Sequence, residues 1–253
     1  MRIIDLNADI GEAFGTYRST VDTALLPFVT SVNIACGFHA GDPAVMRQTV
    51  SAAVREGVAI GAHPGLPDLQ GFGRREIRIT ASEAYELTLY QTGALYGFVK
   101  AAGATLHHVK PHGALYNMAA TNEELAQAIV QAIQDFDPSL ILYGQAGSAL
   151  IRAAGQVGIR AASEVFADRT YQDDGFLTSR SDKHALIEDP RQAAAQALYI
   201  ATHQRVISAT GKTIPLKAET ICLHGDQPGA AASARLINSL LKQNGLILKA
   251  PGK

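Results

Sequence analysis

Short runs of apolar and small residues alternate with longer segments of helical pattern from one end of this chain to the other. Seven of these runs are expected to be strands, at Ile3–Ala8, Ser31–Cys36, Val58–Ala62, Leu106–Lys110, Leu140–Tyr143, Ile159–Glu164 and Thr220–His224. Most of them are nearly continuous in apolar or small residues, as is typical of strands covered on both faces. Such an alternation predicts a parallel sheet joined by right-handed crossovers.

The segments between these strands carry signals for helix starts and stops. The expected starts are Asp42-Pro43, Thr80-x-x-Glu83, Thr121-x-x-Glu124, Asp189-Pro190 and Pro228-Gly229. Proline suits the first helical position, and the Thr-x-x-Glu pairs match the capping box. The last helix is expected to end near Asn244-Gly245.

Polar residues recur at the carboxyl ends of nearly all the predicted strands. An open doubly wound sheet would gather them near one switch point, so we favour a closed barrel. No linker, charge block or low-complexity tract divides the 253 residues. Single α/β domains of about 200–250 residues are common, and the sequence therefore predicts one seven-stranded parallel β/α barrel over residues 1–253.

Composition excludes several classes of protein. The 22 basic and 23 acidic residues give a net charge of −1, which argues against a nucleic-acid binder. No run approaches the ~20 apolar residues of a membrane span, and the N-terminal segment lacks the features of a signal peptide. Cys36 and Cys222 lack CxxC spacing and are expected to be reduced thiols. We therefore expect a soluble cytoplasmic protein.

Histidines gather where the site of a barrel is expected. Six of the eight lie at or just beyond the end of a predicted strand, namely His39, His63, His107, His108, His112 and His224. In a barrel these strand ends converge on one face. His184 and His203 fall in a loop and a helix, and we interpret them as surface residues. For His107 alone, a role as a satisfied polar side chain inside the barrel mouth is an equally good explanation.

Two chemistries are compatible with this polar set. In the first, Asp9, His39 and His63 bind a divalent transition metal such as zinc, manganese or iron, with Glu12 or Asp42 nearby. In the second, no metal takes part and the groups bind and protonate a small polar substrate directly. A third interpretation is that some of them are satisfied polar groups in the barrel mouth.

Two apparent motifs are rejected. Ala209–Thr213 reads like the end of a P-loop, but the earlier glycine position holds Val206, inside an expected helix. Gly147-Ser148 lacks the second glycine of a nucleophile elbow, because Leu150 stands there.

Taken together, the strand-end motifs resemble the LamB/YcsF family, the family of the A component of 5-oxoprolinase. They are DLNADIGE (5–12), NIACGFHAGDP (33–43), GAHPGLPDLQGFGRR (61–75), HHVKPHGALYN (107–117), EVFADRTYQDDGFLTSR (164–180) and LHGDQPGA (223–230). The resemblance implies a seven-stranded β/α barrel similar to the glycoside hydrolase/deacetylase group. It also implies ATP-dependent opening of 5-oxo-L-proline to L-glutamate, with formation of ADP and phosphate, together with partner subunits B and C.

The reaction that the resemblance implies suggests catalytic roles for several of these residues. Asp9 or Glu12 would activate water, and His63 and His112 would move protons. Lys110 would stabilise anionic oxygens of a phosphate or tetrahedral intermediate. The ATP, with its Mg²⁺, is bound either by this chain or by a partner.

Binding roles follow from the charge of the substrates. Arg169 would stabilise phosphate or tetrahedral oxygens, and Arg74 or Arg75 would bind the substrate carboxylate. Further binding residues are expected at other strand ends, namely Asn7, His224 and Asp226. Two alternatives remain open: an independent metal-dependent hydrolase or deacetylase of a small amide or sugar, and a non-catalytic component that only binds 5-oxoproline.

Overall fold

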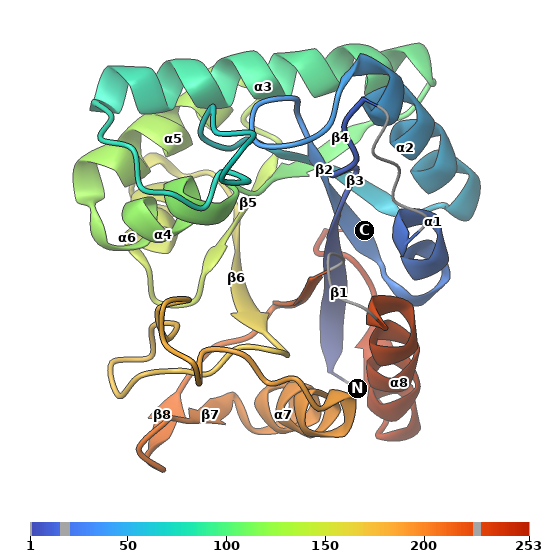
Figure 1. The fold of residues 1–253 in the computed structure, drawn as a ribbon, viewed down its shortest axis with the longest axis vertical. Helices are drawn as coiled ribbons and strands as arrows, with labels where there is room; N and C mark the ends of the chain where they lie inside the picture. Colours follow the sequence, from blue (N-terminus) through green and yellow to red (C-terminus); the bar gives the residue numbers. More distant parts are fainter. Residues whose placement is uncertain (1, 16–20, 225–228, 253) are drawn as a thin grey trace.

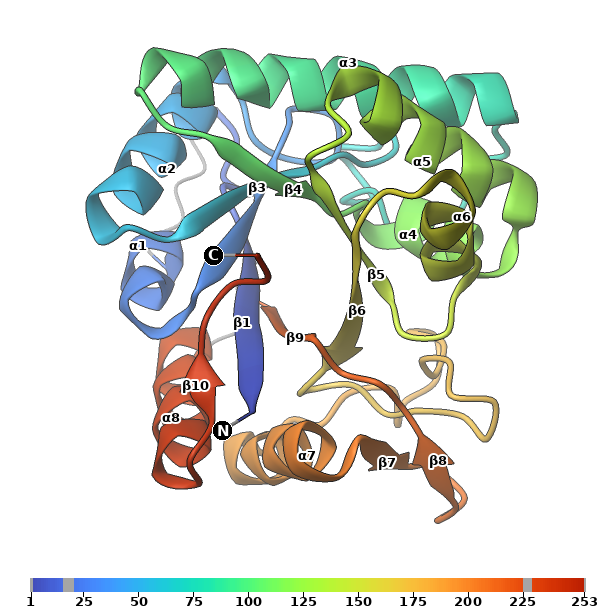
Figure 2. The same ribbon diagram turned by 180° about the vertical axis from the view of Figure 1, so that it is seen from behind.

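The computed structural model describes residues 2–15, 21–224 and 229–252. Within these residues seven parallel strands form a closed barrel (Figures 1 and 2), in the order β1 (Ile3–Ile10), β2 (Ser31–Ala35), β3 (Ala59–His63), β4 (Leu106–Val109), β5 (Ile141–Gln145), β6 (Ala161–Phe166) and β9 (Thr220–His224). Strand β9 pairs with both β6 and β1, which closes the sheet on itself. The predicted seven-stranded parallel barrel is confirmed.

Helices surround the barrel on the outside (Figure 1). They are α1 (Val21–Leu25) with a 3₁₀ turn (Leu26–Phe28), α2 (Pro43–Glu56), α3 (Ala81–Ala101), α4 (Gly113–Thr121), α5 (Glu123–Phe136), α6 (Ala149–Val157), α7 (Pro190–His203) and α8 (Ala230–Gln243). The side chains of Asp42, Thr80 and Asp189 cap α2, α3 and α7 as predicted. Of the last predicted start, Pro228 lies outside the described residues, while Gly229 precedes α8. No described helix is both long and apolar enough to cross a membrane.

The capping box predicted at Thr121 is wrong. Thr121 is the last residue of α4, a helix that the sequence pattern does not separate from the next one. The N-cap of α5 is Asn122, whose side-chain oxygen accepts hydrogen bonds from the backbone of Glu124 and Leu125. Asparagine serves this role as well as threonine, and the extended backbone at Asn122 is what breaks the two helices apart.

Three short strands were not predicted. β7 (Arg205–Ile207) and β8 (Thr213–Pro215) form an antiparallel hairpin after α7, and β10 (Ile247–Leu248) pairs with the start of β1. Val206 therefore lies in a strand and not in a helix, which corrects the reason given for rejecting the P-loop. The rejection itself stands, because the glycine and lysine of that segment form the turn of a β-hairpin.

The barrel interior is polar. In β1 the residues Ile4, Leu6, Ala8 and Ile10 belong to the hydrophobic core, whereas the alternate residues at 5, 7 and 9 are buried carboxylates and an amide. Their hydrogen bonds reach residues of neighbouring strands, including Asp5 to Ser31 and Thr220, and Asn7 to Glu164. The alternation of β1 is thus clean, unlike the continuous apolar pattern expected of most strands, and only its last polar residue reaches the barrel mouth.

Candidate active site

A cavity of about 640 Å³ lies at the carboxyl ends of the barrel strands. Its lining comes from β1, β3, β5, β6, α4 and the loops that follow β1, β3, β4 and β6. It includes Asp9, Glu12, His63, Arg74, Lys110, His112, Tyr116, Gln145, Phe166, Arg169 and Arg180. This is the end of a β/α barrel where ligands bind. The cavity therefore lies where the sequence predicts that the carboxyl ends of the strands converge.

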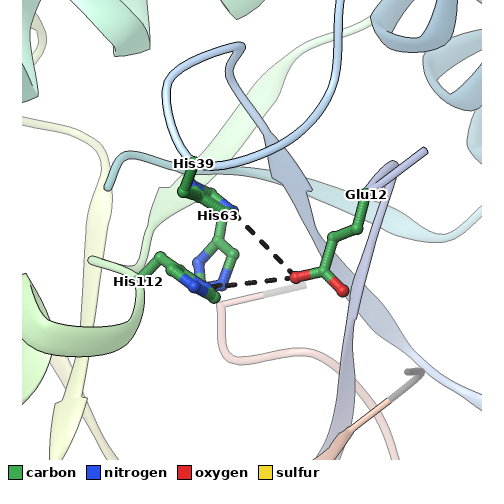
Figure 3. Close-up of side chains that lie close together, drawn as sticks. All are labelled: Glu12, His39, His63 and His112. Atoms are coloured by element: carbon green, nitrogen blue, oxygen red, sulfur yellow. Dashed lines mark hydrogen bonds and ion pairs between the residues drawn. The ribbon is translucent and has the colours of Figure 1, made fainter. Parts of the chain in front are cut away.

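Three imidazoles and one carboxylate lie close together (Figure 3), and three of these four residues line the cavity. The ligand atoms of Glu12, His39, His63 and His112 all lie within 4.8 Å of one another. Oε1 of Glu12 is 4.0 Å from Nε2 of His39 and 4.0 Å from Nδ1 of His112. The rings of His39 and His112 are stacked, with centroids 3.7 Å apart, and each meets the ring of His63 edge-on.

Backbone carbonyls fix the tautomers of two of these rings. Nδ1 of His63 lies 2.7 Å from the carbonyl oxygen of Lys110, and Nε2 of His112 lies 2.8 Å from that of Phe72. Since a carbonyl only accepts, both of these nitrogens carry the proton. In the neutral rings the opposite nitrogens then hold lone pairs, and they face each other at 3.0 Å. Two facing lone pairs at this distance repel each other, and a proton or a metal ion between or beside them would relieve the repulsion.

The third imidazole has no hydrogen bond at all within the described part of the chain. Both ring nitrogens of His39 are buried and without a hydrogen-bond partner. Burial, and then the neighbouring imidazoles, hold the pKa of His39 and that of His112 well below the usual histidine value. Neutral imidazole nitrogens and one carboxylate are a donor set that suits a transition metal, and a backbone carbonyl on the far nitrogen is the usual orientation of such ligands.

The metal site predicted from the sequence is therefore only partly reproduced. His39 and His63 belong to the candidate group, but Asp9 does not, and Glu12 and His112 complete it instead. Asp42 is not available as a ligand, because its carboxylate caps α2 and accepts a hydrogen bond from the backbone of Gly15.

Glycine makes room for the cluster. A Cβ on Gly65 would lie 2.5 Å from Nδ1 of His39, closer than real Cβ contacts. A Cβ on Gly113, whose φ is +55°, would lie 2.5 Å from the carbonyl oxygen of Gly73. The glycines that follow β3 and β4 thus allow the His39 ring and the start of α4 to pack against neighbouring backbone.

Below the cluster, Lys110 joins two carboxylates. Its Nζ lies 2.9 Å from Oδ1 of Asp9, 2.8 Å from Oε1 of Glu164 and 3.0 Å from Sγ of Cys222. Burial alone would favour the neutral amine, but the carboxylates raise the pKa of Lys110 well above the usual lysine value. Lys110 is therefore a fixed positive charge, and Asp9, 3.4 Å from Nε2 of His63, connects it to the imidazoles.

Glu164 and Tyr116 were not selected from the sequence, although both matter here. Glu164 is fully buried and accepts hydrogen bonds from the hydroxyl of Tyr116, at 2.7 Å, and from the amide of Asn7, at 3.0 Å. Tyr116 lines the cavity one helical turn after His112. The sequence did contain a signal for each: Glu164 is the last residue of a predicted strand, and Tyr116 follows His112 at the i, i+4 spacing of a helix.

Arginines occupy the part of the cavity that follows β6. Arg169 is only 3% exposed and donates hydrogen bonds to the carbonyl oxygens of Thr178, at 2.6 Å, and Ala185, at 3.3 Å. Burial, and then nearby Arg180, lower its pKa to about 10, so it remains charged at neutral pH. Arg180 lines the same cavity and was not selected from the sequence.

Of the two predicted carboxylate-binding arginines, only one faces the cavity. Arg74 lines it, with its guanidinium 4.8 Å from the centre of the Phe72 ring. Arg75 pairs with Asp68, and its side chain is 64% exposed. The geometry therefore favours Arg74 over Arg75.

The loop that carries Arg180 is anchored by the segment that resembles a P-loop. Asp173 accepts hydrogen bonds from the side chains of Ser208 (2.7 Å), Thr210 (2.6 Å) and Lys212 (2.6 Å), which hold its pKa well below the usual carboxyl value. These three residues form the β7–β8 turn. The segment that resembles a P-loop thus has a structural role, because its hydrogen bonds to Asp173 hold the Arg180 loop in place.

The remaining predicted residues lie elsewhere. Asn7 does not line the cavity, because it is fully buried between Glu164, Thr220 and Asn33. His224 ends β9 beside Asp9 in the strand register, but its side chain is not described, and Asp226 lies outside the described residues.

Two of the six clustered histidines are structural. His108 lies within the barrel, with Nε2 2.7 Å from the side-chain oxygen of Asn33 and its ring stacked on Tyr143. His107 does not line the cavity, and its Nε2 lies 2.8 Å from the carbonyl oxygen of Pro251. His184 and His203 are exposed, as predicted.

The fold and the cavity together define a β/α-barrel protein with a polar ligand site at the carboxyl ends of its strands. A match to the LamB/YcsF family extends over residues 4–253. The chain belongs to this family.

Relatives over the full length support the assignment. The chain is 57% identical over 250 residues to the protein of Tolumonas auensis that is named as the A component of 5-oxoprolinase, covering 99% of this chain and all of the relative. The crystal structure of the lactam utilization protein from Thermus thermophilus is 43% identical and superposes with a TM-score of 0.92, over 98% of this chain and 99% of that one.

More distant structures share the fold alone. A T48 deacetylase, 16% identical, has a TM-score of 0.52 over 98% of this chain and 88% of that chain. A GH113 β-1,4-mannanase, 11% identical, has a TM-score of 0.51 over 96% of this chain and 99% of that chain. The barrel is thus of the kind found in deacetylases and glycoside hydrolases, as the resemblance implied.

Proposed function

We propose that this chain is the A component of a cytoplasmic 5-oxoprolinase and contains its lactam-opening site. The reaction converts 5-oxo-L-proline, water and ATP to L-glutamate, ADP and phosphate, in an assembly with subunits B and C. Family membership and the name shared by the curated relatives support the substrate. The observation that carries the chemistry is the pair of imidazole nitrogens 3.0 Å apart in the cavity wall, next to Glu12.

The imidazole–carboxylate group would hold a divalent transition metal through Glu12, His39, His63 and His112. When bound there, such an ion supplies Lewis acidity, which lowers the pKa of water and polarises a carbonyl group. The orphaned nitrogens of His39 and the backbone-held tautomers of the other two rings fit this role. Because their far nitrogens are tied to carbonyls, His63 and His112 serve better as ligands than as proton carriers.

Of the two candidate bases, Asp9 is the better placed. Its carboxylate lines the cavity and pairs with the ammonium of Lys110, whereas Glu12 belongs to the imidazole group. Asp9 would take a proton from water as the new C–O bond forms at the lactam carbon, and would return it to the ring nitrogen as the C–N bond breaks. The fixed charge of Lys110 would stabilise the negatively charged oxygens of the phosphorylated tetrahedral intermediate between these two steps.

The arginines that line the cavity, here called the arginine wall, would bind the anionic groups of 5-oxoproline and ATP. Arg74 would pair with the substrate carboxylate, and Arg169 with Arg180 would stabilise a phosphoryl group. Transfer of the γ-phosphoryl group of ATP to the lactam oxygen would release ADP and make the ring carbon a better electrophile, which explains why opening an unstrained amide ring is coupled to ATP. Addition of water and cleavage of the C–N bond would then leave an acyl phosphate, and a second water would release glutamate and phosphate.

Reconstitution of the complex tests this proposal. The chain together with subunits B and C is expected to form glutamate and ADP in equal amounts from 5-oxoproline. Asp9→Asn should abolish both products while the complex still assembles. Unchanged 5-oxoproline-dependent ATP hydrolysis by Asp9→Asn would refute the role of Asp9, and ADP without glutamate would count against lactam opening.

The same donor set also favours a second candidate, an ATP-independent metal hydrolase that acts on a small amide or sugar ester. The isolated chain would then release acetate or an amine from such substrates without ATP, and chelation would stop it. Turnover that depends strictly on ATP and the partner subunits excludes this candidate. A chain that only binds 5-oxoproline, in turn, would tolerate Asp9→Asn without loss of turnover by the complex.

A further inference from the structure

Gln145 is a buried amide that lines the cavity, and its side chain donates no hydrogen bond within the described residues. It is the last residue of β5, is only 2% exposed and lines the cavity. In the strand register it is the partner of Glu164, whose side chain points into the barrel. Its amide nitrogen has no hydrogen-bond partner in the described part of the chain. A buried donor left in this state costs free energy unless a ligand or water accepts from it.

The chemistry of a carboxamide says what would fit. A five-membered lactam forces its amide bond into the cis form, so its N–H and C=O lie side by side on one edge. A primary carboxamide presents the matching pair, one carbonyl acceptor beside one N–H donor. Open-chain amides such as N-acetyl groups are trans and place the two groups on opposite sides. A single carboxamide can therefore pair at two points with a lactam and at only one point with an acetamide.

We propose that Gln145 determines specificity by pairing with the cis-lactam edge of the substrate. Its Nε2 donates to the lactam carbonyl and its Oε1 accepts from the ring N–H. The second lone pair of the lactam carbonyl stays available for the reaction. This inference rests on the proposed function, because it assumes 5-oxoproline in the cavity, and it explains how a barrel shared with deacetylases selects a cyclic amide.

Binding of two non-hydrolysable analogues to the full chain tests the pairing. In 3-oxocyclopentane-1-carboxylate the ring nitrogen is replaced by carbon and the carbonyl is kept, whereas cyclopentanecarboxylate lacks the carbonyl. Titration calorimetry should show that the wild-type chain binds the keto compound about tenfold more tightly, as one satisfied buried donor predicts. Gln145→Leu should bind the two compounds within a factor of about two, because it has no donor to satisfy.

Ser148 offers a matched control on the same turn. Its hydroxyl is also buried without a hydrogen-bond partner in the described residues, but Ser148 does not line the cavity. Ser148→Ala should keep the full preference for the keto compound. If Gln145→Leu fails to fold, Gln145→Glu takes its place, since an ionised carboxylate has the same shape and cannot donate.

The outcomes separate the two claims. A wild-type preference that disappears in the Gln145 variant and survives in Ser148→Ala supports the inference. A preference that survives in the Gln145 variant overturns the inference and leaves the proposed function standing. If the wild-type chain binds neither 5-oxoproline nor the keto compound, alone or in the complex, the proposed function fails and the inference falls with it.

Discussion

Burial lowers the pKa of basic groups on both walls of the cavity, but it leaves the two walls in different charge states. On the wall formed by β1 to β4, desolvation holds the pKa of His39 and His112 down and leaves neutral nitrogen donors around Glu12. On the wall after β6, Arg169 is equally buried, yet its pKa falls only to about 10 and it stays cationic. The same low-polarity surroundings thus produce a site for a cation on one side and for anions on the other.

The largest effect should come from disrupting the imidazole wall, the wall that carries Glu12, His39, His63 and His112. His63→Ala removes a ligand whose far nitrogen is fixed by the Lys110 carbonyl. Because Lewis-acid stabilisation is worth several kcal/mol, turnover of 5-oxoproline by the complex should fall roughly a thousandfold. His203→Ala, at an exposed position on α7, is the control and should leave turnover unchanged. A fall of less than tenfold in His63→Ala would show that this wall is not the reacting one.

The second-largest effect is expected from removing the positive charge of Lys110, which lies below the imidazole cluster. Lys110→Met leaves the carboxylates of Asp9 and Glu164 buried without their shared cation. The free energy of unfolding should drop by about 3–5 kcal/mol, as for other broken buried ion pairs. Because the pKa of Lys110 is raised in the fold, its stabilising contribution is complete below the unfolded lysine pKa and is lost only as pH rises through the folded value.

Denaturant melts at pH 7 and 9 measure this loss. The difference between wild type and Lys110→Met should be the same at both values, because Lys110 is fully charged at each of them. A difference that shrinks between pH 7 and 9 would mean that the amine is already losing its proton, contrary to the contacts at 2.8 and 2.9 Å.

Breaking the arginine wall should affect binding more than chemistry. Arg169→Met removes a charge that the proposal uses for anionic groups, and KM should rise about tenfold, as loss of a charge-assisted hydrogen bond predicts, with a smaller change in kcat. Steady-state kinetics of the complex at several substrate concentrations separate the two constants. Since the pKa of Arg169 is about 10, wild-type KM should not respond to this group between pH 7 and 9. A fall in kcat with unchanged KM would contradict a binding role.

The smallest effect is expected at the anchor of the Arg180 loop. Asp173→Asn weakens three hydrogen bonds to the β7–β8 turn and should raise KM about two- to threefold, because the anchored residues do not touch substrate directly. Lys212→Met should act similarly, and the double variant should be no worse than the stronger single one. Strictly additive effects would show that the two residues do not act through one contact.

Much of the fold could be predicted because strand positions and helix caps are local properties. All seven barrel strands were predicted to within a few residues, and the carboxyl-end rule placed Asp9, Glu12, His63, Lys110 and His112 at one cavity. Thr121 was misassigned because Asn122 next to it caps equally well. Asn7 was misplaced because the period of two in β1 points residues 5, 7 and 9 all inward, and only the last one reaches the cavity.

The choice of carboxylate could not be predicted from the sequence. Asp9 and Glu12 are both close to the end of β1, and each is a plausible ligand by residue type. What separates them is contact with Lys110, which lies 101 positions further along the chain and binds Asp9 at 2.9 Å. Side-chain pairing at such separations depends on strand order and register, which no local pattern contains.

Metal content of matched variants tests the central claim most directly. Elemental analysis of the purified chain should find one equivalent of a transition metal in the wild type and in Asp9→Asn, and much less in Glu12→Gln. This result would place the cation on the imidazole wall with Glu12 as its carboxylate. A wild-type chain that binds no transition metal, or an Asp9→Asn chain that loses the metal while Glu12→Gln retains it, would contradict the account.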